Sequence, residues 1–254
     1  MRTSQIILVV VLLFAGMLAF LEIGLRLGRR ATEGIGKAFS TLAGAVFALM
    51  GLLIAFTFSG AATRYEARRQ LIVAETNAIG TAYLRIDLLP LPRQEPLRDS
   101  FRRYLDARLA FYRKLGDLVA AKAEMARVEA LQQDIWSQTI TACREGCSPP
   151  VTAFVLASLN EMIDITTTRT VALQTHPPTV VFLLLALLPL ICSLLAGYDA
   201  AGKGRSLMHM LCFVVILTIT IFIILDYEYP RSGLFIHLDA TDQILVDLRN
   251  RMNR

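Results

Sequence analysis

Histidine and cysteine are scarce in this chain, which has three histidines and four cysteines in 254 residues. The histidines lie far apart, and no two cysteines have the CxxC spacing of a zinc site. The sequence also lacks a GxSxG motif, a P-loop and a recognisable pair of catalytic carboxylates. We therefore predict no metal site, no cofactor, no catalytic residue and no enzymatic activity.

Basic patches with interleaved aromatic residues are missing as well, although the net charge is +5. Such patches are the usual mark of a nucleic-acid-binding surface. The basic residues instead flank long apolar runs, where they orient membrane spans. We expect no nucleic-acid partner.

Apolar residues are abundant, since 55% of the chain is hydrophobic and its mean hydropathy is +0.52. A soluble domain of this length rarely needs so much apolar content. The sequence therefore predicts a multi-pass protein of the plasma membrane, with the lipid bilayer as its first partner. About 20 apolar residues in a helix cross a bilayer, and the four runs of about this length are Gln5–Leu25, Ala38–Gly60, Thr179–Ala196 and Leu207–Leu225.

The middle of the chain, residues 61–176, is polar and charged and has a helical pattern. No proline follows the second apolar run until Pro90, so its helix should continue into this segment. The prolines of Leu89–Pro96 predict a turn, after which the helical pattern resumes at Leu97 and breaks near Gly116.

These patterns predict an all-α membrane protein with four transmembrane helices and a helical-bundle soluble insert between the second and the third. The second helix continues into the insert. The predicted divisions are transmembrane helices 1 and 2 (1–60), the insert (61–176), transmembrane helices 3 and 4 (177–225), and a tail with a short amphipathic helix (226–254).

Small side chains recur at steps of three and four along the second apolar run, on one face of a helix. The run has no ionisable side chain, so a pore lined by it would present hydroxyls, backbone dipoles and apolar rings. The alternative is that the small residues let another helix approach closely. The pore-lining candidates of this stripe are Thr41, Gly44, Ala48, Gly51, Ala55 and Ser59.

Arginines follow this run at once. At a pore mouth they would raise the local concentration of small anions, which are therefore candidate partners. The alternatives are a solvated face that pairs with nearby acidic residues, or a structural polar network between packed insert helices. The pore-mouth or polar-network candidates are Arg64, Glu66, Arg68, Arg69, Asn160 and Asp164.

Two cysteines, Cys143 and Cys147, lie at the end of a predicted insert helix. They can form a disulfide if the insert faces an oxidising compartment, and they are two free thiols if it does not. The basic connectors 26–37 and 197–205 favour an external insert by the positive-inside rule, but arginines near the other span ends nearly balance them. The side of the membrane that carries the insert stays open.

The segment FTFSGAATRYEARRQLIVAETNAIGTAYLR, from Phe56 onward, resembles the end of the second membrane helix of bestrophins. Nearly the whole chain is similar to the bacterial bestrophin-like domain family of unknown function. Two further motifs support this resemblance: ASLNEMID (Ala157–Asp164) and D-x-x-x-P-R-S-G, which begins at Asp226. The resemblance implies a pentameric anion channel with a pore-lining second helix and a cytoplasmic insert. It also implies that Thr57, Phe58 and Ser59 are pore-lining candidates near the inner end of the pore. The tail shows no match to the acidic calcium-binding cluster of bestrophins.

Two functions fit these features. The first is an ion channel, a homo-oligomer in which the second membrane helix lines the pore. The second is a non-conducting membrane scaffold or sensor whose helical insert binds a partner. The lack of charged side chains in the second, third and fourth spans suits helix packing at least as well as transport.

Overall fold

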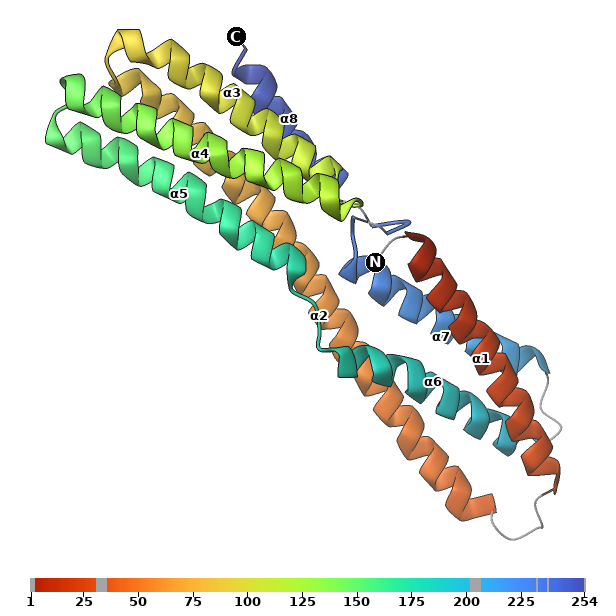
Figure 1. Cartoon of the computed structure of the whole chain (residues 1–254). Helices are drawn as coiled ribbons and strands as arrows, with labels where there is room; N and C mark the ends of the chain where they lie inside the picture. The colour runs from red at the N-terminus through yellow and green to blue at the C-terminus, as the bar shows by residue number, and fades with distance from the viewer. Residues whose placement is uncertain (1–2, 31–35, 202–206, 232, 237, 254) are drawn as a thin grey trace. The chain divides into compact units, whose positions relative to one another are not determined.

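The computed structural model describes residues 3–30, 36–201, 207–231, 233–236 and 238–253. Within these ranges the chain is helical and contains no strand, which confirms the predicted all-α class (Figure 1). Parts of the two connectors, residues 31–35 and residues 202–206 with the basic Lys203 and Arg205, lie outside the described residues. The elements are α1 (Thr3–Arg30), α2 (Gly36–Leu84), the short 3-10 helix η1 (Arg85–Leu88), α3 (Leu91–Arg113), α4 (Leu118–Gly146), α5 (Pro149–Gln174), α6 (Thr179–Ala200), α7 (Leu207–Glu228) and α8 (Asp239–Arg251).

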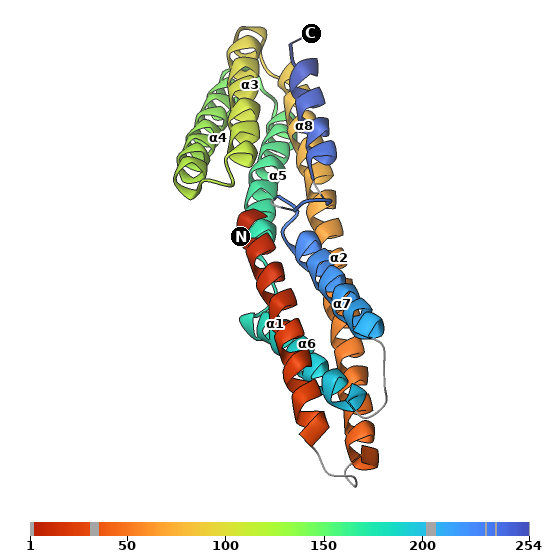
Figure 2. The same ribbon diagram turned by 90° about the vertical axis from the view of Figure 1, so that its right-hand side faces the viewer.

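The helices form two compact units. The first unit contains Met1–Tyr65 and His176–Ile236, and the second contains Glu66–Thr175 and His237–Arg254. α2 contributes its first part to one unit and its remainder to the other (Figure 2). Each unit is described separately below.

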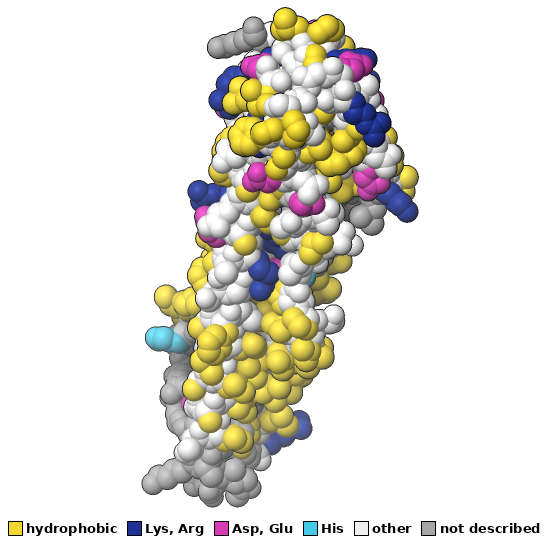
Figure 3. All heavy atoms as spheres, turned by 90° about the vertical axis from the view of Figure 1, so that its left-hand side faces the viewer, with side chains coloured by type: hydrophobic (Ala, Val, Ile, Leu, Met, Phe, Trp, Pro, Cys, Tyr) yellow, Lys and Arg dark blue, Asp and Glu magenta, His cyan; other side chains and the backbone are white. Residues whose placement is uncertain are grey.

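Four helical stretches contain an apolar window long enough to cross a membrane. Their large side chains are widely exposed. On the face drawn in Figure 3, hydrophobic side chains gather over the first unit, whereas most of the charged ones lie on the second. Extended apolar surface of this kind marks contact with a membrane or another protein. The stretches are Thr3–Arg30, Thr41–Leu88, Pro149–Ala200 (which holds α5 and α6) and Met208–Glu228.

In the first unit, α1 lies along α6 at a crossing that only glycine permits. A Cβ on Gly24 would stand 2.0 Å from the carbonyl oxygen of Leu194, and one on Gly197 would stand 2.1 Å from that of Leu21. Small residues let apolar helices approach closely and gain van der Waals contact where lipid offers no hydrophobic driving force. The two glycines therefore fix the α1–α6 pair.

Two polar residues near the end of α1 form an ion pair. Glu22 and Arg26 are one turn apart, and the Arg26 Nε donates to the Glu22 carboxylate at 2.8 Å. Both side chains are exposed, as expected for an ion pair at a membrane interface.

The predicted turn over Leu89–Pro96 is shorter than expected, because only Leu89 and Pro90 lie between η1 and α3, which begins at Leu91 and contains Pro92 and Pro96. Pro92 stands in the first helical turn, where a proline costs little since the first N–H groups of a helix have no partner within it, whereas Pro96 lies further inside the helix. The break predicted near Gly116 is confirmed: α3 ends before it, and α4 starts after Asp117. The Asp117 carboxylate caps α4 by accepting hydrogen bonds from two backbone N–H groups, at 3.0 and 3.2 Å.

Candidate functional site

The predicted pore-lining face of α2 is uncovered in the first unit. A Cβ on Gly44 or Gly51 would meet nothing within 4 Å, in contrast to the tight glycines of the α1–α6 crossing. Among the described residues, these two glycines therefore have no helix of their own chain against them. Thr57 is partly buried and donates to the carbonyl oxygen of Leu53 at 2.7 Å, while the exposed candidates are Thr41, Gly44, Ala48, Gly51, Ala55, Phe58 and Ser59.

The packed face of α2 lies elsewhere on the helix. Met50 is buried in the core of the first unit, and Phe47 meets Phe213 of α7 edge to face with ring centroids 5.8 Å apart. A third face carries large exposed side chains, among them Leu52 and Phe56. The small-residue stripe thus lies between a face that packs within the chain and a face that suits lipid or another subunit.

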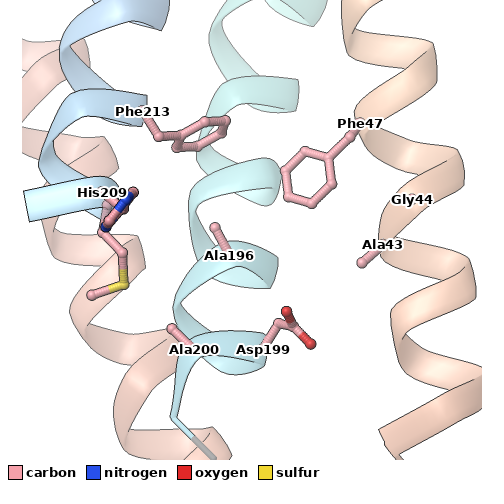
Figure 4. Close-up of a pocket in the computed structure, with 9 residues that line it drawn as sticks. Ala43, Gly44, Phe47, Ala196, Asp199, Ala200, His209 and Phe213 are labelled. Carbon is pink, nitrogen blue, oxygen red and sulfur yellow. The ribbon is translucent and has the colours of Figure 1, made fainter. Parts of the chain in front are cut away.

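A cavity of about 450 Å³ opens beside the start of the stripe, between α2, α6 and α7. Gly44 and Phe47 form its α2 wall, and Figure 4 shows the carboxylate of Asp199 pointing toward α2. His209 lines the α7 side. This part of the stripe therefore borders a cavity whose opposite walls carry the polar side chains of Asp199 and His209.

Arg64, a predicted pore-mouth residue, is held in an ion pair in the first unit. Its guanidinium donates to the Glu228 carboxylate at 2.8 and 2.9 Å, and Glu228 also lies 2.8 Å from the Nδ1 of His176. The Glu228 side chain is 1% exposed. The charge of Arg64 is therefore compensated inside the unit, and the residue joins α2 to α7.

The other charged candidates on α2 belong to the second unit and differ in role. Arg68 is buried and donates to the carbonyl oxygens of Ala172 and Thr175, at 3.1 and 2.8 Å. It thereby satisfies carbonyl groups at the C-terminus of α5, where a cation is favoured. Arg69 and Glu66 form an exposed pair one turn apart, at 3.3 Å. Arg69 is thus the candidate arginine that faces solvent.

Asn160 and Asp164 are exposed on α5. Nearby on the same helix, Phe154 accepts a hydrogen bond from Arg85 through its carbonyl oxygen at 2.7 Å, and the Arg85 guanidinium stacks over its ring at 3.5 Å. A network that joins Asn160 and Asp164 to the arginines remains a prediction.

A buried charge cluster that the sequence reading missed lies in the second unit. Glu75 of α2 is fully buried and accepts a hydrogen bond from Arg108 of α3 at 2.5 Å, and it is also bonded to Arg169 of α5. Arg169 reaches Asp242 of α8 at 3.0 Å. The cluster holds two positive and two negative groups, so its charges balance where unpaired ones would be costly.

Tyr112 completes the shell around Glu75. Its hydroxyl accepts from Arg108 and donates to Glu75 at 3.0 Å. Burial raises the pKa of Tyr112 well above its ordinary value, and the Glu75 charge adds to this, so the hydroxyl keeps its proton. Burial also opposes the charged form of Glu75, but Arg108 and Arg169 outweigh it and lower the pKa of that carboxyl.

The D-x-x-x-P-R-S-G motif has a structural reason. The Asp226 carboxylate, at the end of α7, accepts hydrogen bonds from the backbone N–H groups of Leu234, Phe235 and Ile236 at 2.6, 3.1 and 2.8 Å. It thereby organises the loop that follows the fourth apolar helix. Ser232 of the motif lies outside the described residues.

Cys143 and Cys147 are free thiols at the end of α4, with Cys143 buried. Burial raises the pKa of Cys147 to about 11, and contact with Cys143 adds to the shift. A disulfide between them stays a prediction. In the described part of the chain, no group of three or more His, Cys, Asp or Glu residues is placed to hold a metal ion.

The sequence did contain signals for the missed residues. Glu75 interrupts an apolar pattern in IVAETNAI, and Glu228 and His176 directly flank apolar runs. An ionisable residue at such a position is costly unless paired. What the sequence alone does not give is the partner, because Arg169 lies 94 residues from Glu75.

Comparison with known proteins identifies the family of this chain and a solved structure with a similar fold. The family model of the Bestrophin-like domain matches residues 6–235. No curated protein matches the chain. The fold is similar to the crystal structure of a bacterial bestrophin homolog from Klebsiella pneumoniae that carries a tyrosine-to-alanine mutation, with a TM-score of 0.65, 15% identity, and coverage of 97% of this chain and 99% of that chain. At this identity the likeness shows a shared fold, whereas the family match spans most of the sequence, so the chain belongs to the Bestrophin-like domain family.

Proposed function

We propose that this protein is the subunit of a homo-oligomeric ion channel in the bacterial inner membrane, with the small-residue stripe of α2 lining the pore. The observation that carries the proposal is the uncovered stripe: Gly44 and Gly51 border open space, whereas the glycines of α1 and α6 are fully used for packing. Several copies around an axis would cover the stripe or enclose a pore with it. Membership of the Bestrophin-like domain family supports this arrangement.

Such a pore would have no fixed charge in its apolar part. The run Ala38–Gly60 contains no ionisable side chain, so ions would meet hydroxyls, backbone dipoles and the ring of Phe58. Selectivity would then depend on how easily an ion sheds water, and large, weakly hydrated ions would pass best.

Arg69 is the residue that would favour anions in this proposal. It follows Gly51 by 18 residues in one unbroken helix, which is about five turns and returns to the same face. Arg64 and Arg68 contribute less because a carboxylate and two carbonyl oxygens already occupy them. In this proposal the second unit, with α3 to α5, is the helical soluble insert, and small anions are the permeant partners.

Conductance of the purified protein in planar bilayers tests the proposal. We expect current from the wild-type protein. The current should be strongly reduced in Ala55→Phe, because the larger side chain narrows the pore that the stripe lines. Leu52→Phe is the matched control, because it adds an aromatic ring on the exposed face beside the stripe. A monomeric protein without current in any salt would contradict the channel.

A second candidate function is a membrane scaffold or sensor whose insert binds a partner. The pairing of Arg64 and Arg68 within the chain favours it, since these groups then stabilise the fold instead of attracting ions. The two proposals differ in assembly: a ring with α2 at its axis supports the channel, and a monomer or dimer supports the scaffold.

A further inference from the structure

A second cavity lies entirely within the second unit, between the last turns of α2 and the end of α8. Its volume is about 390 Å³, which is in the range of small-molecule sites, roughly 300–1,000 Å³. Asn77, Thr81 and Tyr83 line it from α2, and Arg251 and Met252 line it from α8. The cavity is too large for a single halide ion and has room for a small organic molecule.

The polar groups that line this cavity are mainly hydrogen-bond donors. Arg251 offers N–H groups that keep their charge at every physiological pH, and Asn77 and Thr81 add an amide and a hydroxyl. None of the lining residues is acidic. Tyr83 is occupied, because its hydroxyl donates to the carbonyl oxygen of Met252 at 3.3 Å. The donor set therefore suits an anion.

Two further guanidinium groups stand next to the lining residues. Arg98 lies over the ring of Tyr83, 5.1 Å from its centroid, and the Nε of Arg102 donates to the carbonyl oxygen of Met252 at 3.0 Å. Their acidic partners, Asp87 and Glu95, have side chains 59% and 73% exposed. Each of these guanidinium groups is therefore paired with a carboxylate, and the positive charge at the cavity wall comes from Arg251.

We propose that this cavity binds a small organic anion of the carboxylate or phosphate class, with Arg251 as its charge partner and Asn77 and Thr81 as donors. The site is separate from the proposed pore stripe and does not require that the protein conducts ions. The same anionic chemistry can come from a free metabolite or from a phospholipid headgroup.

Isothermal titration of the full-length protein in detergent tests this site, with citrate, inorganic phosphate and a short-chain phosphatidic acid as probes at constant ionic strength. Binding of citrate or phosphate identifies a free anion, and binding of the phosphatidic acid alone identifies a headgroup. Arg251→Gln should weaken the affinity at least tenfold. Arg251 is exposed in the last turn of α8, so its loss should leave the fold intact.

Arg127→Gln is the matched control, because it removes the same charge from the exposed side of α4. Thr81→Val is a second variant that removes one hydroxyl without changing the side-chain shape, and it should weaken binding severalfold. Unchanged unfolding temperatures without ligand show that all three variants fold. The proposal is overturned if no probe binds, or if Arg251→Gln and Arg127→Gln bind the probes equally well.

Discussion

Asp226 and Gly233 are so close that a Cβ on Gly233 would stand 2.6 Å from the Oδ1 of Asp226. The carbonyl oxygen of Ile236 would be 2.8 Å from the same Cβ. The loop after α7 therefore needs both residues: the carboxylate collects the backbone N–H groups, and the glycine lets the chain turn around it. This contact explains why the aspartate and the glycine occur in one motif.

Gly233→Ala should destabilise the first unit by about 1–3 kcal/mol, the range of substitutions that displace a buried hydrogen-bonded group. The Asp226 carboxylate cannot move away from the added methyl group without losing the hydrogen bonds that it accepts from three backbone N–H groups. The measurement is the unfolding temperature in detergent. Gly116→Ala is the control, since a Cβ there would meet nothing within 4 Å, and its unfolding temperature should be close to that of the wild-type protein. Equal effects of the two substitutions would contradict the close approach.

Glu75→Gln should destabilise the second unit by about 3–5 kcal/mol, because it leaves two buried guanidinium groups with one carboxylate fewer. Glu66→Gln removes an exposed carboxylate from the same helix, and its effect should be at most about 1 kcal/mol. Unfolding by denaturant, followed by the fluorescence of Trp136, measures both. A small effect at Glu75 would mean that Asp242 and Tyr112 suffice to hold the arginines.

The Glu75 cluster also predicts how stability depends on pH. The pKa of Glu75 is lower in the folded state than its ordinary value, so the folded state binds fewer protons there. Its stabilisation is fully present above about pH 4.3, the ordinary pKa of glutamate, and is lost as the pH falls through the lower folded-state value. Glu75→Gln should therefore flatten the acid limb of the stability curve.

Periodicity and run length predicted the helices. An apolar run of about 20 residues, or apolar residues that recur at steps of three and four, is compatible with few structures other than a helix. They also predicted the break near Gly116. The α3 start at Leu91 was missed because a proline reads as a stop, although the first helical turn tolerates it. Contacts such as that of Glu75 with Arg169 depend on how distant helices pack, and no local pattern encodes that packing.

Cys147 should react slowly with iodoacetamide at neutral pH and faster as the pH rises toward 11. Only the thiolate reacts, and the pKa of Cys147 is about 11. The rate should rise about tenfold per pH unit below this value. Mass spectrometry of the labelled peptide measures it. Rapid labelling of Cys147 at pH 7 would contradict the raised pKa, and protection that a reductant removes would indicate the disulfide.

The stripe of α2 makes the most direct prediction about assembly. In a background without the four native cysteines, Gly51→Cys and Ala55→Cys should form intersubunit disulfides under copper phenanthroline. Both positions are exposed, and Gly51 borders open space. If several copies of the chain place α2 at a shared axis, these residues of neighbouring copies come close together. Gel electrophoresis without reductant measures the disulfide-linked dimer, which is the largest product that one cysteine per chain can form.

Leu8→Cys is the control for random collision in the membrane, because Leu8 is an exposed apolar residue of α1, outside the stripe. A helix that lines a shared axis meets its own copies far more often than a helix that faces lipid, so Gly51→Cys should cross-link at much lower oxidant exposure than Leu8→Cys. Equal cross-linking at the two positions would place α2 away from any axis and favour the scaffold. The double variant Gly51→Cys/Ala55→Cys has two thiols in each chain, so its disulfide-linked products can contain more than two subunits only if each α2 meets two neighbouring copies, as in a closed ring.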